Sequence, residues 1–155
     1  MKTYRDLVND ILPEITELFP WDLDERLGGD DAPLLVDIRE PAEFARAHVE
    51  GSINVPRGVL ESACDWGYQE TLPALAAARE RPVVLMCKSG NRSALAAKVL
   101  QDMGYKNVAS LKTGLRGWND YEQPLVDGKG APVDIDDAEA FFTDQVTEEQ
   151  MGPKV

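Results

Sequence analysis

Two short runs of consecutive apolar residues constrain the fold of this chain more than any other feature. One lies in PLLVDI, residues 33–38, and the other is VVLM, residues 83–86. Continuous apolar runs of this length are typical of strands buried on both faces, which occur in parallel sheets covered by helices on either side. The second run, in VVLMCKSGNRS, leads directly onto Cys87 and a small, polar loop.

Helix-like and strand-like segments alternate over the rest of the chain. Further short strands are predicted at 14–18, 52–56 and 107–111. The spacing of apolar residues and the positions of Pro and Gly predict helices at 1–12, 20–27, 41–48, 72–80, 93–103 and 114–121, with one or two helical turns at 138–142. This alternation predicts an α/β fold with a parallel sheet, right-handed crossovers and three layers.

Composition argues against several classes of function. The 155 residues, 43% of them hydrophobic, fit one globular domain with its own core. The net charge of −12 argues against nucleic acid as a partner, because binding it requires basic patches. No apolar run approaches the roughly 20 residues that span a bilayer. The N-terminus lacks the apolar segment of a signal peptide, so a cytoplasmic location without membrane association is expected.

The two cysteines and the one histidine offer little for a metal site, because they show no typical ligand spacing. A structural metal ion is therefore not expected. A disulfide between Cys64 and Cys87 is not expected either, because the cytoplasm is reducing.

The negative charge is concentrated near the C-terminus. Residues 120–155 hold ten acidic residues and two lysines, a net charge of −8 out of −12. A solvated tail is the simpler interpretation, and a docking or lid segment is the alternative. The chain is accordingly divided into an N-terminal helical extension (1–13), a central domain (14–125) and an acidic C-terminal tail (126–155).

The loop after Met86 has the clearest chemical potential. Ligands bind at the carboxyl ends of strands in parallel α/β sheets, and Cys87 follows such an end, with a helix predicted about six residues later. Unpaired backbone N–H groups and the helix dipole would form a cradle for an anion there. That cradle favours the thiolate, the reactive form of cysteine, and would also hold a persulfide. Gly90 lets the loop curl, and further donors or cations come from Lys88, Ser89, Asn91, Arg92 and Ser93.

The alternative for Cys87 is a buried core cysteine at a strand end, which is a common arrangement. The basic, glycine-containing loop argues against it.

The sequence resembles the rhodanese family of sulfurtransferases over roughly residues 14–125. The similarity rests on LLVDIREPAEFARAHVEGSINVP and VVLMCKSGNRSALAAKVLQDMGYKNVASLKTGLRGW. Family members show a D-[VI]-R-E segment, an H-I-x-G-A-x-N-[IVL]-P segment, a cysteine loop and a Gly-Gly-x-x-x-W segment. The matching residues here are Asp37 to Glu40, His48 to Pro56, the loop after Cys87, and Gly114 to Trp118, with Thr113 where glycine is usual.

The resemblance implies a rhodanese-like α/β/α fold with a five-stranded parallel sheet, and a sulfurtransferase that needs no metal or organic cofactor. Cys87 would take a sulfane sulfur from thiosulfate or a low-molecular-weight persulfide, become a persulfide, and pass the sulfur to cyanide, a thiol or a sulfur-carrier protein. Residues 88–93 would bind the substrate. Four residues separate Cys87 from Arg92. Sulfurtransferases have this spacing, whereas the related cell-cycle phosphatases have five residues between the cysteine and the arginine. The resemblance therefore favours a sulfur substrate over a phosphate substrate.

Other residues of the matched segments have less certain roles. Asp37 and Arg39 either support the loop through an ion pair or hydrogen bonds, or form a structural pair. Arg57 follows a strand end, where it either reaches the mouth of the site or does not. His48 is interpreted as a structural hydrogen-bonding residue.

Two aromatic or sulfur-containing residues are interpreted as structural. Trp118 is expected in the core rather than as a platform for substrate. Cys64 is interpreted as a bystander, with a resolving thiol as the alternative.

Two classes of function remain open on the sequence. The first is an enzyme that turns over thiosulfate or a small persulfide. The second is a sulfur-relay module that moves persulfide sulfur between partner proteins with little turnover of small molecules. The N-terminal helix and the acidic tail would serve the second as docking surfaces. A phosphatase or arsenate reductase is disfavoured by the length of the loop.

Overall fold

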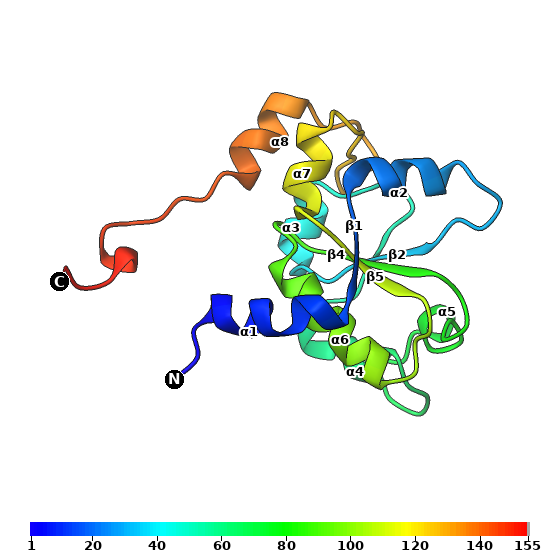
Figure 1. Cartoon of the computed structure of the whole chain (residues 1–155). Helices are drawn as coiled ribbons and strands as arrows, with labels where there is room; N and C mark the ends of the chain where they lie inside the picture. Colours follow the sequence, from blue (N-terminus) through cyan, green and yellow to red (C-terminus); the bar gives the residue numbers. More distant parts are fainter. Residues whose placement is uncertain (155) are drawn as a thin grey trace.

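The structure, a computed structural model that describes residues 1–154, confirms the three-layer α/β fold. Its sheet has five strands in the order β1-β5-β4-β2-β3, and every pairing is parallel (Figure 1). The strands are β1 (Thr16–Leu18), β2 (Leu34–Asp37), β3 (Ile53–Asn54), β4 (Val83–Met86) and β5 (Val108–Leu111). The two long apolar runs of the sequence are β2 and β4, which lie side by side near the centre of the sheet.

Helices cover both faces of the sheet. They are α1 (Tyr4–Ile11), α2 (Pro20–Leu27), α3 (Pro41–Arg46), α4 (Leu60–Ala63), α5 (Pro73–Ala76), α6 (Asn91–Asp102), α7 (Gly114–Asp120) and α8 (Ile135–Phe142). Short 3-10 turns span Leu12–Glu14, Arg57–Val59 and Glu149–Met151. Residues of α4, α5 and α6 join one core cluster, and residues of α2, α7 and α8 join the other. Within residues 1–154, no helix has the length and apolarity to cross a bilayer.

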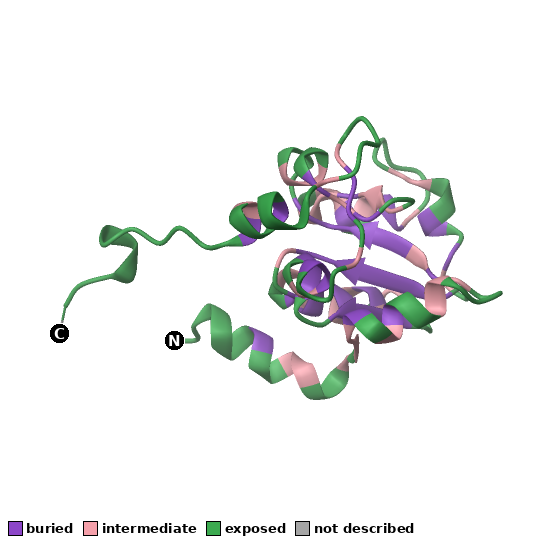
Figure 2. Cartoon of the chain, turned by 90° about the horizontal axis from the view of Figure 1, so that it is seen from above, coloured by how far each residue is buried: buried purple, intermediate pink, exposed green. Residues whose placement is uncertain are grey.

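The core lies on both sides of β4. Val83 and Leu85 belong to one core cluster, and Val84 and Met86 belong to the other. All four residues of the strand are buried, which is the burial that a continuous apolar run predicts (Figure 2). The central strand is therefore held from both faces, and the residue that follows it starts from a rigid position.

Several helices differ from their predicted bounds, and two of the differences lie on either side of β4. The helix predicted at 72–80 is one turn, α5, which ends at Ala76. The helix predicted at 93–103 begins two residues earlier, at Asn91. Gly90 explains the second difference, because its φ of +94° allows the chain to turn from the loop into the helix at once. The loop between β4 and α6 is therefore shorter than expected.

The two terminal segments both contact the domain. The N-terminal helix α1 packs against α6 through the buried side chain of Val8. Val126, the first residue of the predicted acidic tail, pairs with His48, and α8 packs on α7 with Phe142 buried in the core. Residues 145–154 are exposed, and Figure 2 shows this stretch leading away from the sheet. The acidic segment thus has a packed part and an exposed part.

Candidate active site

The site lies at the carboxyl end of β4. Cys87 follows Met86 directly, and three residues later Gly90 turns the chain into α6. The Cys87 side chain is fully buried beneath this loop. The sequence thus places the sulfur of Cys87 between a rigid strand and the first turn of the helix that follows it.

Three hydrogen-bonding groups converge on Cys87 Sγ. The backbone N–H of Gly90 donates to the sulfur at 3.1 Å and that of Ser93 at 3.3 Å. Ser93 Oγ lies 3.3 Å from the sulfur and 2.7 Å from Ser110 Oγ. Both serines are fully buried, so this chain of hydroxyl groups is shielded from water. Donors aimed at a sulfur atom favour its anionic form over the neutral thiol.

The turn between β5 and α7 holds the loop from behind. Leu115 N–H donates to the carbonyl of Cys87 at 2.9 Å, and Arg116 N–H donates to that of Lys88 at 3.0 Å. Gly114 leaves no room for a side chain, because an added Cβ would lie 2.4 Å from Lys88 O. Thr113, at the position where the family usually has glycine, adopts a left-handed φ of +67°.

The loop also has backbone donors without a protein acceptor. Among residues 1–154, the N–H groups of Lys88, Ser89, Asn91 and Arg92 donate to no protein atom. All four belong to the segment that curls around Cys87. They are therefore available to a second sulfur atom or to another anionic group bound at the loop.

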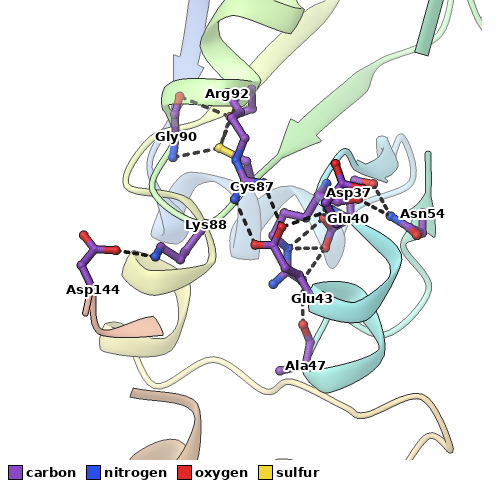
Figure 3. A network of polar contacts seen from close by, with 12 residues as sticks. Asp37, Glu40, Glu43, Ala47, Asn54, Cys87, Lys88, Gly90, Arg92 and Asp144 are labelled. Atoms are coloured by element: carbon purple, nitrogen blue, oxygen red, sulfur yellow. Dashed lines mark hydrogen bonds and ion pairs between the residues drawn. The ribbon is translucent and has the colours of Figure 1, made fainter. Parts of the chain in front are cut away.

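Both cations of the loop are paired with carboxylates (Figure 3). Arg92 forms a bidentate pair with Glu43 of α3, with distances of 2.9 and 3.0 Å. Lys88 donates to the Asp144 carboxylate, two residues beyond α8. Arg92 lowers the pKa of Glu43, and Lys88 lowers the pKa of Asp144, mainly through these hydrogen bonds. Lys88 and Arg92 therefore form no free positive patch in the described structure.

Asp37 and Arg39 form an ion pair that is buried beside the site. The Asp37 carboxylate accepts from the Arg39 Nε at 3.0 Å and from its Nη2 at 2.8 Å, and both side chains are fully buried. Asn54 Nδ2 donates to the carbonyls of Asp37 and Arg39, and Arg39 Nη2 donates to that of Ala47. The pair thus joins the ends of β2 and β3 to the end of α3. No described hydrogen bond connects it to residues 88–93.

The remaining candidates do not meet at the sulfur. Arg57 forms an ion pair with Glu61, one turn further along the chain, and makes no described hydrogen bond to the loop. His48 Nδ1 hydrogen-bonds to Phe44 O at 2.7 Å, which is the structural role predicted for it. Trp118 is buried in the core, as predicted, and its Nε1 donates to Pro124 O. Cys64 is a free, buried thiol, and burial raises its pKa.

Sequence reasoning missed the roles of four residues of the site, although Gly114 lies in the matched glycine segment. Ser110 and Gly114 support the loop, and Glu43 and Asp144 neutralise its cations. Ser110 carries a detectable signal, because it is the polar residue in the apolar stretch VASL, which forms β5. Within residues 1–154, no cluster of three or more His, Cys, Asp or Glu side chains is arranged to hold a metal ion.

A groove of about 550 Å³ lies beside Ser89 of the loop. Its wall contains Phe19 stacked on Trp21, with ring centroids 4.6 Å apart, and Tyr121 packed against Trp21 by its edge. Trp21 and Tyr121 are exposed. The groove therefore offers an aromatic surface next to the loop that holds Cys87.

The fold and the site place a cysteine loop at the carboxyl end of a central strand of a parallel α/β sheet, and comparison with known proteins supplies the family. The rhodanese-like domain model matches residues 20–121. The chain therefore belongs to the rhodanese-like domain family, as its sequence motifs predict.

Relatives with known names agree with this assignment. A putative mitochondrial thiosulfate sulfurtransferase of Schizosaccharomyces pombe is 35% identical over 103 residues, which cover 64% of this chain and 72% of the relative. A sulfurtransferase of Allochromatium vinosum is 30% identical over 116 residues, which cover 75% of this chain and 99% of the relative. In several other relatives the match spans about half of the relative's length or less.

A solved structure extends the similarity to the three-dimensional fold. A protein of unknown function from Rhodopseudomonas palustris, described as a possible tyrosine phosphatase, has a TM-score of 0.72 and 31% identity. The match covers 81% of this chain and 95% of that one. The family and the relatives together support a role in sulfur transfer or sulfur relay.

The hydroxyl of Ser93 is expected to assist the sulfur atom of Cys87 directly. Ser93→Ala removes the hydroxyl but keeps the backbone N–H, so the rate at which Cys87 reacts with a sulfur donor should fall roughly three- to tenfold, the loss typical of one hydrogen bond. Ser110→Ala should lower the rate less, because Ser93 keeps its hydroxyl. Single-turnover kinetics followed by intact mass measure both rates. Equal losses in the two variants would indicate general disturbance of the core instead.

Proposed function

We propose that the protein is a sulfurtransferase that carries a sulfane sulfur on Cys87 as a persulfide. The supporting observation is the convergence of the Gly90 and Ser93 N–H groups on Cys87 Sγ at 3.1 and 3.3 Å, with further N–H groups of the loop that have no acceptor among residues 1–154. The first set of donors stabilises the thiolate that attacks. The second set can stabilise the terminal sulfur of Cys–S–S⁻, one atom further out.

The reaction with thiosulfate has two balanced steps. The Cys87 thiolate attacks the outer sulfur of thiosulfate, a new sulfur–sulfur bond forms, and sulfite leaves with the electron pair of the bond that breaks. A nucleophile such as cyanide or a thiolate then attacks the terminal sulfur of the persulfide. When the terminal sulfur leaves with that nucleophile, the Cys87 thiolate is regenerated. The scheme is therefore ping-pong and needs no redox partner.

The second candidate is a sulfur-relay module. The aromatic groove beside Ser89 favours it, because exposed Trp21 and Tyr121 form a surface of the kind that anchors protein partners. In this case the donor and the acceptor are both proteins, and the loop takes part in a brief complex with each. A cytoplasmic location is part of both proposals.

One set of assays separates the candidates. Steady-state formation of thiocyanate from thiosulfate and cyanide tests the enzyme. Transfer of sulfur from persulfidated protein to a thiol-bearing carrier protein tests the relay, and intact mass shows whether Cys87 gains one sulfur atom. Hydrolysis of p-nitrophenyl phosphate tests a phosphatase. Phosphatase activity without sulfur transfer would contradict both proposals.

The structure gives a reason to expect no phosphatase activity. The Arg92 guanidinium is engaged by Glu43 on both sides of its fork, so it does not face the loop as a free phosphate ligand.

A further inference from the structure

The carboxylate of Asp144 lies between two cations that belong to different elements. Lys88 of the cysteine loop donates to Asp144 Oδ1, and Arg116 Nη1 of α7 lies 3.9 Å from Asp144 Oδ2 (Figure 3 shows the Lys88 contact). Lys88 is the residue directly after Cys87, and its carbonyl accepts the N–H of Arg116. The two cations thus form an anion position at the edge of the loop, and a carboxylate of the same chain fills it.

The packing of α8 on the domain positions the Asp144 carboxylate. The helix α8, which precedes Asp144, is fixed to the domain by the buried ring of Phe142, and Asn119 of α7 donates to Ile135 O at 3.0 Å. Asp144 follows two residues after the helix, and the chain beyond it is exposed. The carboxylate is therefore delivered by a packed helix, but the side chain itself is more than half exposed.

Such a contact can exchange with an incoming anion. Solvent-exposed ion pairs contribute little to stability, so opening one costs little. Any anionic donor that approaches Cys87 meets Lys88 already neutralised, in a protein whose net charge of −12 also repels it. The cost of displacing Asp144 rises with the charge that the donor brings.

We propose that Asp144 is a specificity-determining residue, whose carboxylate occupies the anion position beside Lys88 and Arg116 and thereby disfavours dianionic sulfur donors relative to donors of lower charge. The inference rests on the proposed function in one respect, namely that sulfur donors are the substrates of Cys87. The effect of the Asp144 charge on anions that approach Cys87 does not depend on that function.

The test compares Asp144→Asn with a matched control, Glu139→Gln. Glu139 lies on α8, and within residues 1–154 its side chain forms no ion pair, so both variants lose one negative charge but only one opens the anion position. With thiosulfate, a dianion, kcat/KM of Asp144→Asn should rise about two- to fivefold, mainly through KM. With benzenethiosulfonate, a monoanion, the rise should be smaller. Glu139→Gln should change neither, and Asp144→Glu should restore the selectivity of the original protein.

A second measurement does not depend on sulfur transfer. Cys87 is alkylated with iodoacetate, an anion, and with iodoacetamide, which is uncharged, and the two rates are compared by peptide mass. The ratio of the iodoacetate rate to the iodoacetamide rate should rise in Asp144→Asn and stay constant in Glu139→Gln, and 0.5 M salt should reduce the difference as screening predicts. An unchanged ratio in Asp144→Asn overturns the inference. A raised ratio in a protein that transfers no sulfur from any donor keeps the inference and refutes the proposed function.

Discussion

Cys87→Ser is expected to reduce sulfur transfer to below about one part in a thousand of the original rate, as loss of a nucleophile does in other enzymes. An alcohol cannot form a persulfide, so no extra sulfur atom should appear in the intact mass after incubation with any donor. The fold should persist. The serine hydroxyl is nearly the size of the thiol and can accept the N–H groups of Gly90 and Ser93 that now point at the sulfur.

The control for this variant is the second thiol. Cys64 is fully buried in the core cluster that contains Leu60 and Leu75, and burial raises its pKa, so little of it is ionised near neutral pH. Cys64→Ala should therefore retain most of the activity, measured under the same conditions and corrected for any loss of folded protein. If both variants are equally inactive while folded, the two thiols act together, and the interpretation of Cys64 as a bystander is wrong.

The parts of the fold that the sequence predicts are those with local causes. The apolar runs of β2 and β4 are local signals, and the structure confirms both strands and the parallel sheet. The helix α6 begins two residues before its predicted start, because a loop of small polar residues gives no sign of where its backbone begins to coil. The left-handed φ of Gly90 decides that point, and an added side chain there would place its Cβ 3.2 Å from Leu111 O and from Thr113 N.

The site also contains residues that the sequence predicts and residues that only the fold reveals. Cys87, Gly90 and Ser93 are neighbours in the sequence, and their convergence follows from a strand that leads into a helix. The partners of the two cations could not be found from the sequence. Glu43 is 49 residues from Arg92, and Asp144 is 56 residues from Lys88, so only the folded chain brings them together. A sequence alone shows that a cation is present but does not show which carboxylate neutralises it.

Asp37→Ala is expected to destabilise the protein by about 3–5 kcal/mol, because it leaves the guanidinium of Arg39 buried without its counter-charge. Both side chains are fully buried, and Arg39 Nη1 has no hydrogen-bond partner among the described residues, so the arginine has no second carboxylate to replace Asp37. The loss is a large part of the total stability of a typical domain, about 5–15 kcal/mol. Urea unfolding measures it. The matched control is Glu61→Ala, which breaks the exposed Arg57–Glu61 pair and should cost at most about 1 kcal/mol.

The double variant Asp37→Leu/Arg39→Met decides whether this pair is structural or supports the reaction. Replacing both charges by apolar side chains of similar size removes the desolvation cost together with the attraction, so much of the stability lost in Asp37→Ala should return. The activity of this double variant in sulfur transfer is then the informative measurement. Because the pair bonds to Asn54 and Ala47 and to no residue of the loop, activity should return with stability. A double variant that is stable but inactive would show that the charges act on Cys87 through space, and the structural interpretation of Asp37 and Arg39 would be wrong.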